Sequence, residues 1–263
     1  DEMANRDPRM YQIIDSKYRP YTVKSNGMRV VNSGIDDKKE FSPSEEPGTN
    51  VHSAPGLTGT ATGYSPIKLV SASQSQQDAV KTSSYDWFVF RYAEILLIYA
   101  EAKCELGECT QAVLDETINK LRDRVEMKHL TVSPVADLNP VDYGYSITPL
   151  LYEIRRERRV ELMAEGYRYH DLMRWACGIR LNQPKLGIIP DKATSENDLN
   201  GYNTKDYESI KSGLGFVDGA IDVYTKRMTN PVPNFIDPKN YLFSIPTNQI
   251  GLNPNLKQNP GWD

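Results

Sequence analysis

The sequence lacks the features that mark several common classes of protein. Its 31 Lys and Arg residues stand against 35 Asp and Glu residues, so no basic excess predicts nucleic-acid binding. The three Cys and three His residues show no Cys-x-x-Cys or Cys/His spacing typical of zinc. The sequence also contains no HExxH, GxSxG or GxxxxGK[ST] pattern. We therefore predict a protein that is not an enzyme, with no catalytic residues, no metal ligands and no nucleic-acid partner.

The sequence also has little that could cross or enter a membrane. Its longest apolar-rich helical stretch, residues 86–102, is interrupted by Glu94 and Glu101, so it does not predict a transmembrane helix. The chain starts at Asp1 without an initiator Met or a signal peptide, and its opening Asp7-Pro8-Arg9 looks like the interior of a larger protein. We expect a fragment, whose missing N-terminal part would carry any targeting signal.

Helical periodicity is present instead. An apolar share of 39% is enough for a sizeable core. Residues 88–107 predict a first helix, in which apolar side chains recur at helical spacing around most of the circumference. We expect this helix to be the central one, with later helices packed against it, and to end near Gly107.

Three further helices follow in the pattern. Thr110 is the expected N-cap of a helix over 111–128, which would form a hairpin with the first helix and weakly resembles a tetratricopeptide unit. Thr148 and Pro149 predict the start of a helix that runs to about Ala164. A fourth helix after Gly166 is expected to direct four side chains inward: Tyr169, Leu172, Met173 and Ala176.

The helices divide the chain into three regions. Residues 1–86 read as loops and short strands that form the ligand face, 87–178 as the helical core, and 179–263 as an irregular region that packs on the helices through Leu256 and Trp262. Strands are expected within 11–14, 28–31, 63–70 and 241–246. The predicted fold class is mainly α, with tetratricopeptide-like helix pairs, long loops and a few short strands in one domain.

The densest charged cluster, residues 153–165, allows two interpretations. It could form a paired-carboxylate or anion site, or it could be a helix with ion-paired faces and one buried ion pair at Arg158. We favour the second, because Arg158 interrupts an apolar stripe and a buried Arg usually pairs with a carboxylate. The candidate partners are Glu161, Asp171 and Glu94.

Two weaker patterns suggest chemistry. His170 and Asp171 are adjacent in a helix and so cannot face each other as a catalytic dyad; we expect Asp171 to fix an Arg, with Trp175 in the core. Asp198, Asn200 and Asp206 could ligate calcium in a loop, although their spacing does not match an EF-hand. We predict no cofactor, with calcium as the open alternative.

Tyrosines outside the predicted helices are the best candidates for ligand contacts. Aromatic rings on loops offer flat apolar faces with a hydroxyl group, which suit the C–H faces of sugar rings. The alternative for each ring is that it covers the edge of the core. Seven tyrosines lie in such loops, and the predicted ligand-binding set is Tyr18, Tyr21, Tyr64, Tyr85 and Tyr202, with Tyr143 and Tyr145 outside that set.

Four segments in order resemble the C-terminal part of the SusD/RagB family. They are residues 90–102, residues 118–124, residues 154–175 with their Arg-Arg-Glu-Arg-Arg-Val-Glu-Leu and Glu-Gly-Tyr-Arg patterns, and residues 245–262 with their Gln-Asn-Pro-Gly-Trp ending. The Asp7-Pro8-Arg9 opening is also similar to a family element. The loops between these segments, where specificity would lie, carry no resemblance.

The resemblance implies a noncatalytic lipoprotein on the outer-membrane surface of a Gram-negative bacterium. Such proteins have a mainly helical SusD-like fold, bind oligosaccharides or polysaccharides, and deliver them to a TonB-dependent SusC-like transporter. The lipid anchor and most of the helix pairs would lie in an N-terminal part outside this chain. Peptide capture, or a scaffold that docks a partner, is the alternative. The matching motifs would be scaffold, with a structural network of Arg91, Glu94, Arg158, Glu161, Asp171, Trp175 and Trp262.

Overall fold

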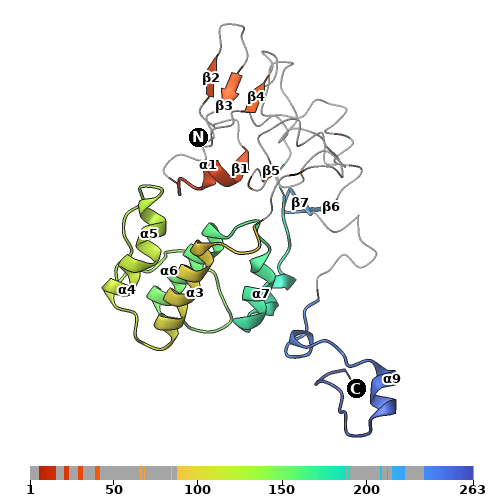
Figure 1. Ribbon diagram of the computed structural model, residues 1–263. Coiled ribbons are helices and arrows are strands. Elements are labelled where there is room, and N and C mark those ends of the chain that lie inside the picture. Colours follow the sequence, from red (N-terminus) through yellow and green to blue (C-terminus); the bar gives the residue numbers. More distant parts are fainter. Residues whose placement is uncertain are drawn as a thin grey trace.

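The computed structural model of the chain describes residues 6–15, 21–23, 29–31, 39–41, 65–66, 68, 84, 88–187, 189, 208, 212, 215–222 and 234–262. These residues form a mainly helical structure with a few short strands, which confirms the predicted fold class (Figure 1). Helices α3 to α7 gather in one group, while the C-terminal segment that carries α9 lies at the opposite end of the picture from strands β2 to β4.

The hydrophobic core lies between α3 (Tyr92–Glu105) and α6 (Pro149–Glu161). Leu97 and Ala100 of α3 and Ile154 of α6 are completely buried in it. Burial of a Leu or Ile side chain contributes about 1.5–3 kcal/mol, so these contacts stabilise the helical group. The prediction that the first helix is the central one is confirmed. The helix ends where expected, because Gly107, with a φ of 71°, takes the left-handed conformation that closes it.

The single helix predicted over 111–128 is wrong. The structure has two short helices, α4 (Gln111–Glu116) and α5 (Ile118–Asp123), separated at Thr117 with a φ of −125° and a ψ of −90°. The Thr117 hydroxyl donates to the Val113 carbonyl at 2.5 Å, a local hydrogen bond that competes with regular helix. The Asn119 side chain accepts from the Leu130 amide at 2.7 Å, which holds the returning loop against α5.

α6 begins as predicted and ends earlier. Thr148 accepts a hydrogen bond from the Leu151 amide at 3.2 Å, and Pro149 occupies the first turn. The helix ends at Glu161 instead of about Ala164. In α7 (Tyr167–Arg174) Leu172 is buried, but Tyr169 and Ala176 are exposed, against the prediction. Ala176 lies beyond the helix end with a φ of 50°, so helical spacing does not place it.

The N-terminal elements differ from the predicted ones. Residues 11–14 were expected to form a strand, but α1 (Met10–Ile13) is a helical turn, and the Asp7 carboxylate accepts from the Arg9 amide at 3.0 Å just before it. β1 (Ile14–Asp15) pairs with β5 (Ser65–Pro66). The strand predicted at 28–31 is β3 (Arg29–Val31), the centre of an antiparallel sheet with β2 (Tyr21–Val23) and β4 (Lys39–Phe41).

The C-terminal region also differs from prediction. The strand expected at 241–246 is absent, since the 3₁₀ turn η3 (Lys239–Tyr241) ends there and residues 242–246 are irregular. Three elements were not anticipated, namely the β6 (Gly215–Val217) and β7 (Ala220–Asp222) hairpin and α9 (Thr247–Leu252). The segment reaches the helical group through η2 (Gly178–Asn182), where the ring of Phe235 packs on Gly178 so closely that a Cβ would lie 2.2 Å from it.

One side of α3 is apolar and exposed. Tyr92, Ile95, Ile98 and Tyr99 are each 43–67% exposed on this side. Among the described residues, no helix is long and apolar enough to cross a membrane.

Candidate functional site

The tyrosines predicted to contact ligand fall almost entirely outside the described residues. This applies to Tyr18, Tyr64, Tyr85 and Tyr202. Tyr21 contributes its backbone to β2, paired with Val31, and its side chain is outside the described part. Their role in binding stays a prediction.

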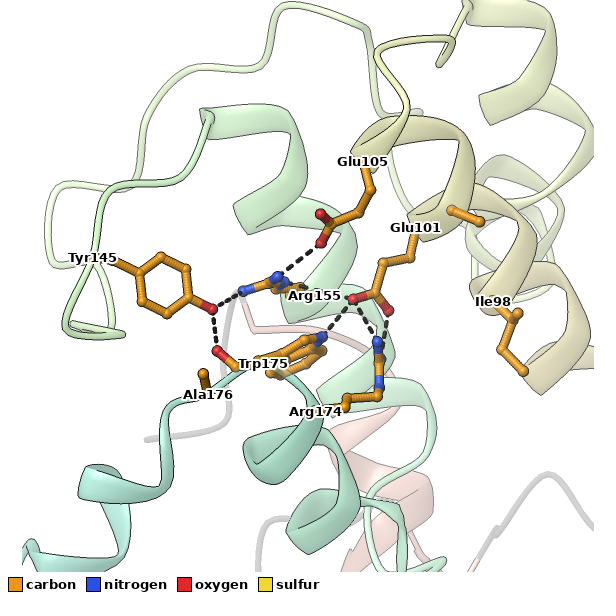
Figure 2. Close-up of a pocket in the computed structure, with 9 residues that line it drawn as sticks. Ile98, Glu101, Glu105, Tyr145, Arg155, Arg174, Trp175 and Ala176 are labelled. Atoms are coloured by element: carbon orange, nitrogen blue, oxygen red, sulfur yellow. Dashed lines mark hydrogen bonds and ion pairs between the residues drawn. The ribbon is translucent and has the colours of Figure 1, made fainter. Parts of the chain in front are cut away.

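A pocket of about 530 Å³ opens beside Trp175 and is called the Trp175 pocket here (Figure 2). Four segments contribute to it: Ile98, Glu101, Ala102 and Glu105 from α3, Arg155 from α6, Arg174 to Ala176 from the end of α7, and Tyr145 from the loop before α6. The pocket therefore lies mainly between α3 and the end of α7.

Glu101 is the central hydrogen-bond acceptor of the Trp175 pocket. Its carboxylate receives the Trp175 indole N–H at 2.5 Å and the two Arg174 Nη atoms at 2.9 and 2.5 Å. Arg155 Nε lies 3.6 Å from the same carboxylate, which is an ion pair beyond hydrogen-bond distance. The floor of the pocket is thus fixed by one buried carboxylate that holds two arginines and one indole.

Arg155 links the floor to the rim. Its guanidinium donates to the Tyr145 hydroxyl and to Glu105, both at 2.9 Å, and lies 4.6 Å from the centre of the Trp175 ring. The Tyr145 hydroxyl donates in turn to the Trp175 carbonyl. Burial would lower the pKa of Arg155, but the hydrogen bonds to Tyr145 and Glu105 raise it above its usual value, so Arg155 is a permanent cation.

The exposed groups of the Trp175 pocket determine what it can bind. Tyr145 is 42% exposed and Ile98 46% exposed, while about half of the Glu105 and Arg174 side chains is accessible. An aromatic ring beside a carboxylate and a guanidinium can stack on an apolar face and exchange hydrogen bonds with hydroxyl groups. These are the contacts that a polyhydroxylated ligand requires.

The second charged site is the carboxylate row, defined as Glu153, Glu157 and Glu161 on α6. Glu157 accepts from Arg9 at 2.6 Å and from Arg122 at 2.9 Å. Glu161 accepts from Arg9 at 3.0 Å, from Arg91 at 2.7 Å and from Arg124 at 2.8 Å. Burial would raise the pKa of Glu161, but the hydrogen bonds from Arg91 and Arg9 and the charge of Arg124 hold it below its usual value.

The remaining residues of the predicted network lie as follows. Arg158 donates through Nε to both oxygens of Asp171 at 2.9 Å, so Asp171 is its partner among the three candidates. Glu94 instead accepts from the Tyr167 hydroxyl, and this hydrogen bond raises the pKa of Tyr167 to about 12. Trp262 donates to the carbonyls of Lys239 and Leu242 and thus fixes its own segment, while Leu256 is 37% exposed. The expected contact of these two residues with the helices is not what the structure shows.

The metal-site and His–Asp candidates find no support in the described part of the chain. No three His, Cys, Asp or Glu residues in it come together as a metal site. Asp198, Asn200 and Asp206 lie outside it, so calcium binding stays untested. His170 is exposed and its ring meets that of Tyr169, while Asp171 is engaged by Arg158 and Arg174.

Sequence reasoning missed most of the Trp175 pocket. Tyr145 was among the loop tyrosines but outside the predicted ligand-binding set, and Glu101, Glu105, Arg155 and Arg174 were assigned no role. The polar strip of α3 holds both glutamates one turn apart, and a carboxylate pair at that spacing facing an Arg-Trp dipeptide is the pattern that could have indicated the site.

Comparisons with known proteins give a consistent result. The family model described as the SusD family matches residues 1–262. The SusD-like protein P38 of Formosa agariphila is 31% identical over 144 residues, 49% of this chain and 27% of that protein. The SusD-like protein P2 of the same organism is 28% identical over 183 residues, 69% of this chain and 27% of that protein.

Solved structures agree with the sequence relatives. A SusD-like carbohydrate binding protein from Bacteroides fragilis superposes with a TM-score of 0.58 at 26% identity, covering 98% of this chain and 42% of that one. Another SusD-like protein from Bacteroides fragilis shares the fold, with a TM-score of 0.52 at 23% identity over 98% of this chain and 39% of that one. The chain therefore spans less than half the length of these relatives.

Proposed function

The chain belongs to the SusD family, and we propose that it binds oligosaccharide or polysaccharide nutrients at the bacterial cell surface without cleaving them. The observation that carries this proposal is the family match over residues 1–262, supported by the carbohydrate binding protein that superposes on 98% of the chain. The Trp175 pocket adds a contact surface, with one exposed aromatic ring beside hydrogen-bonding groups of both charges.

The proposal also covers the membrane location of the protein and its transporter partner. The bound glycan passes to a TonB-dependent SusC-like transporter, and a lipid anchor outside this chain holds the protein on the outer membrane. Copurification of the native protein with a SusC-like barrel from detergent-solubilised outer membranes tests this part. Recovery of the native protein in the soluble fraction, without a barrel, would contradict it.

A glycan panel measured by isothermal titration tests the binding itself, with product analysis for hydrolysis. We expect one polysaccharide to bind without cleavage and Tyr145→Ala to weaken it by about tenfold, since the substitution removes the exposed aromatic face and hydroxyl group of the pocket, and tenfold corresponds to about 1.4 kcal/mol. Tyr99→Ala is the matched control, because Tyr99 is 43% exposed on α3 and lines neither the Trp175 pocket nor any other cavity described here. Tyr64→Ala tests the predicted loop face, and an effect only there would move the site away from the Trp175 pocket.

The exposed apolar side of α3 favours a second candidate, a module that docks a partner. Tyr92, Ile95 and Tyr99 lie along this side in an exposed row. Failure of every glycan to bind, together with copurification of the transporter that Ile95→Glu abolishes, would favour docking over glycan capture.

A further inference from the structure

A second and larger cavity, of about 1180 Å³, lies between α1 and the α6–α7 corner; it is called the arginine cavity here. Met10, Ile13 and Leu162 provide apolar wall, and the rings of Tyr167 and Tyr169 lie on the α7 side. The cavity is distinct from the Trp175 pocket, with which it shares no lining residue.

Positive charge dominates the wall of the arginine cavity. Five arginines line it and only two carboxylates, Asp7 and Asp171. Both carboxylates are already engaged, Asp7 by Arg9 at 2.6 Å and Asp171 by Arg158 and Arg174 at 2.9 Å. Of the other arginines of the wall, Arg156 is paired with Glu153 at 2.6 Å, a carboxylate outside the lining.

Two of these arginines have buried N–H groups without an acceptor. The Arg158 side chain is only 5% exposed, and its Nη1 has no hydrogen-bond partner although its Nε is fixed by Asp171. Arg168 Nη1 is also buried and without a partner. No carboxylate of the described residues forms an ion pair with Arg168 or with the exposed Arg159, and burial together with the charge of Arg159 lowers the pKa of Arg168.

Unpaired guanidinium groups at a cavity are costly unless something accepts their hydrogen bonds and balances their charge. Water meets the first need but not the second. An oxyanion meets both, because its oxygens accept charge-assisted hydrogen bonds from arginine in a fork geometry. In the Trp175 pocket Glu101 and Glu105 balance the charges of Arg155 and Arg174, although Arg155 Nε also lacks a hydrogen-bond partner. At the arginine cavity, by contrast, Arg159 and Arg168 have no carboxylate partner among the described residues.

We propose that the arginine cavity binds the carboxylate or sulfate-ester groups of an acidic oligosaccharide, through Arg158, Arg159 and Arg168. That the ligand is an oligosaccharide rests on the proposed function. That it is anionic rests on Arg159 and Arg168, which have no carboxylate partner among the described residues, and on the free Nη1 of Arg158. Arg158 and Arg168 contact the oxyanion from within the cavity, and Arg159 does so at its mouth. The apolar wall and Tyr169, which is 47% exposed, pack on the sugar ring.

The test is a calorimetric titration of the 263-residue chain with three oligosaccharides of equal length. One is an oligogalacturonide that carries carboxylates, one a sulfated galactan, and one a neutral galactan. We expect at least one acidic oligosaccharide to bind about tenfold or more tightly than the neutral one, and Arg168→Met to remove about that factor by deleting a charge-assisted hydrogen bond. The acidic oligosaccharide that binds more tightly shows whether the cavity prefers a carboxylate or a sulfate ester.

Two further variants make the result decisive. Arg159→Met should weaken acidic binding as well, and because Arg159 is exposed this variant serves if Arg168→Met fails to fold. Arg180→Met is the matched control, since Arg180 lines neither cavity, and its affinity should equal that of the wild type.

The outcomes separate this inference from the proposed function. Equal binding of neutral and acidic oligosaccharides, unchanged by Arg168→Met and Arg159→Met, would overturn the anion site and leave glycan capture standing. If none of these oligosaccharides binds but galacturonate and sulfate ions do so with the same dependence on Arg168, the acidic oligosaccharide is overturned as the ligand, and the glycan panel decides the proposed function. If these ions also fail to bind, the anion site is overturned, and the glycan panel again decides glycan capture.

Discussion

The carboxylate row and the arginine cavity, which both border α6, are built from the same residue types, but their arginines differ in whether they have partners. In the carboxylate row, Glu157 and Glu161 are each held by at least two arginines from other segments. In the arginine cavity, Arg158 and Arg168 keep buried N–H groups without an acceptor. The first site is complete within the chain and therefore structural, whereas the second is complete only with an anion from outside.

The carboxylate row also explains how distant segments are held together. Arg9 precedes α1, Arg91 precedes α3 and Arg124 follows α5, and all three meet at Glu161. Guanidinium groups are suited to this role because they donate in several directions at once and stay charged when buried. A single carboxylate of α6 thereby fixes three chain segments.

The largest effect is expected from breaking the carboxylate row at its centre. Glu161→Gln leaves Arg9, Arg91 and Arg124 facing a neutral amide, and removing one partner of a buried ion pair typically lowers the free energy of unfolding by about 3–5 kcal/mol. Urea denaturation followed by circular dichroism measures this change in the free energy of unfolding. Glu116→Gln is the matched control, because Glu116 is exposed on α4 and should change the stability by less than about 0.5 kcal/mol. A similar loss of unfolding free energy for both variants would show that Glu161 contributes no more to stability than an exposed glutamate.

A pH titration of the free energy of unfolding tests whether the negative charge of Glu161 causes this stabilisation. The pKa of Glu161 is held below its ordinary value of 4.5 in the folded protein, so its stabilisation is complete above that value and is lost as the pH falls through the folded pKa. We expect the difference in free energy of unfolding between wild type and Glu161→Gln to be constant near neutral pH and to shrink below about pH 4.5. A difference that stays constant into strong acid would show that charge is not the cause.

The elements that follow local rules could be predicted from the sequence. The N-cap of α6 at Thr148 and the end of α3 near Gly107 depend on residues next to each other in the chain. The break at Thr117 could not be predicted, because it depends on a hydroxyl bond and on the loop that returns to Asn119. α1 was missed for a similar reason, since Tyr11, Ile13 and Ile14 are residue types that favour a strand, while Asp7 and Arg9 form a turn just before the helix.

The sites were predictable to a smaller extent. The position of Arg158 in an apolar stripe indicated a buried ion pair, and its partner is one of the three carboxylates considered. The other contacts of the network join residues far apart in sequence, such as Arg9 with Glu157 and Glu101 with Trp175. Pattern analysis along one chain carries no information on such pairs, because the packing of α3, α6 and α7 brings them together.

The smallest effect should come from removing an arginine of the cavity, and it provides the sharpest contrast with the carboxylate row. Arg122→Met should lower the free energy of unfolding by about 3–5 kcal/mol, because it takes a buried partner from Glu157. Arg168→Met should change it by less than about 0.5 kcal/mol in anion-free buffer, since the wild-type side chain gains no ion pair there and its half-buried charge repels Arg159. Urea denaturation of both variants measures the contrast. Sulfate stabilises folded proteins in general by exclusion from their surface, so its addition should stabilise both the wild type and Arg168→Met, and the wild type by more if the cavity binds oxyanions. A loss for Arg168→Met as large as that for Arg122→Met, in the absence of any anion, would show that Arg168 has a structural partner and would remove the distinction between the two sites.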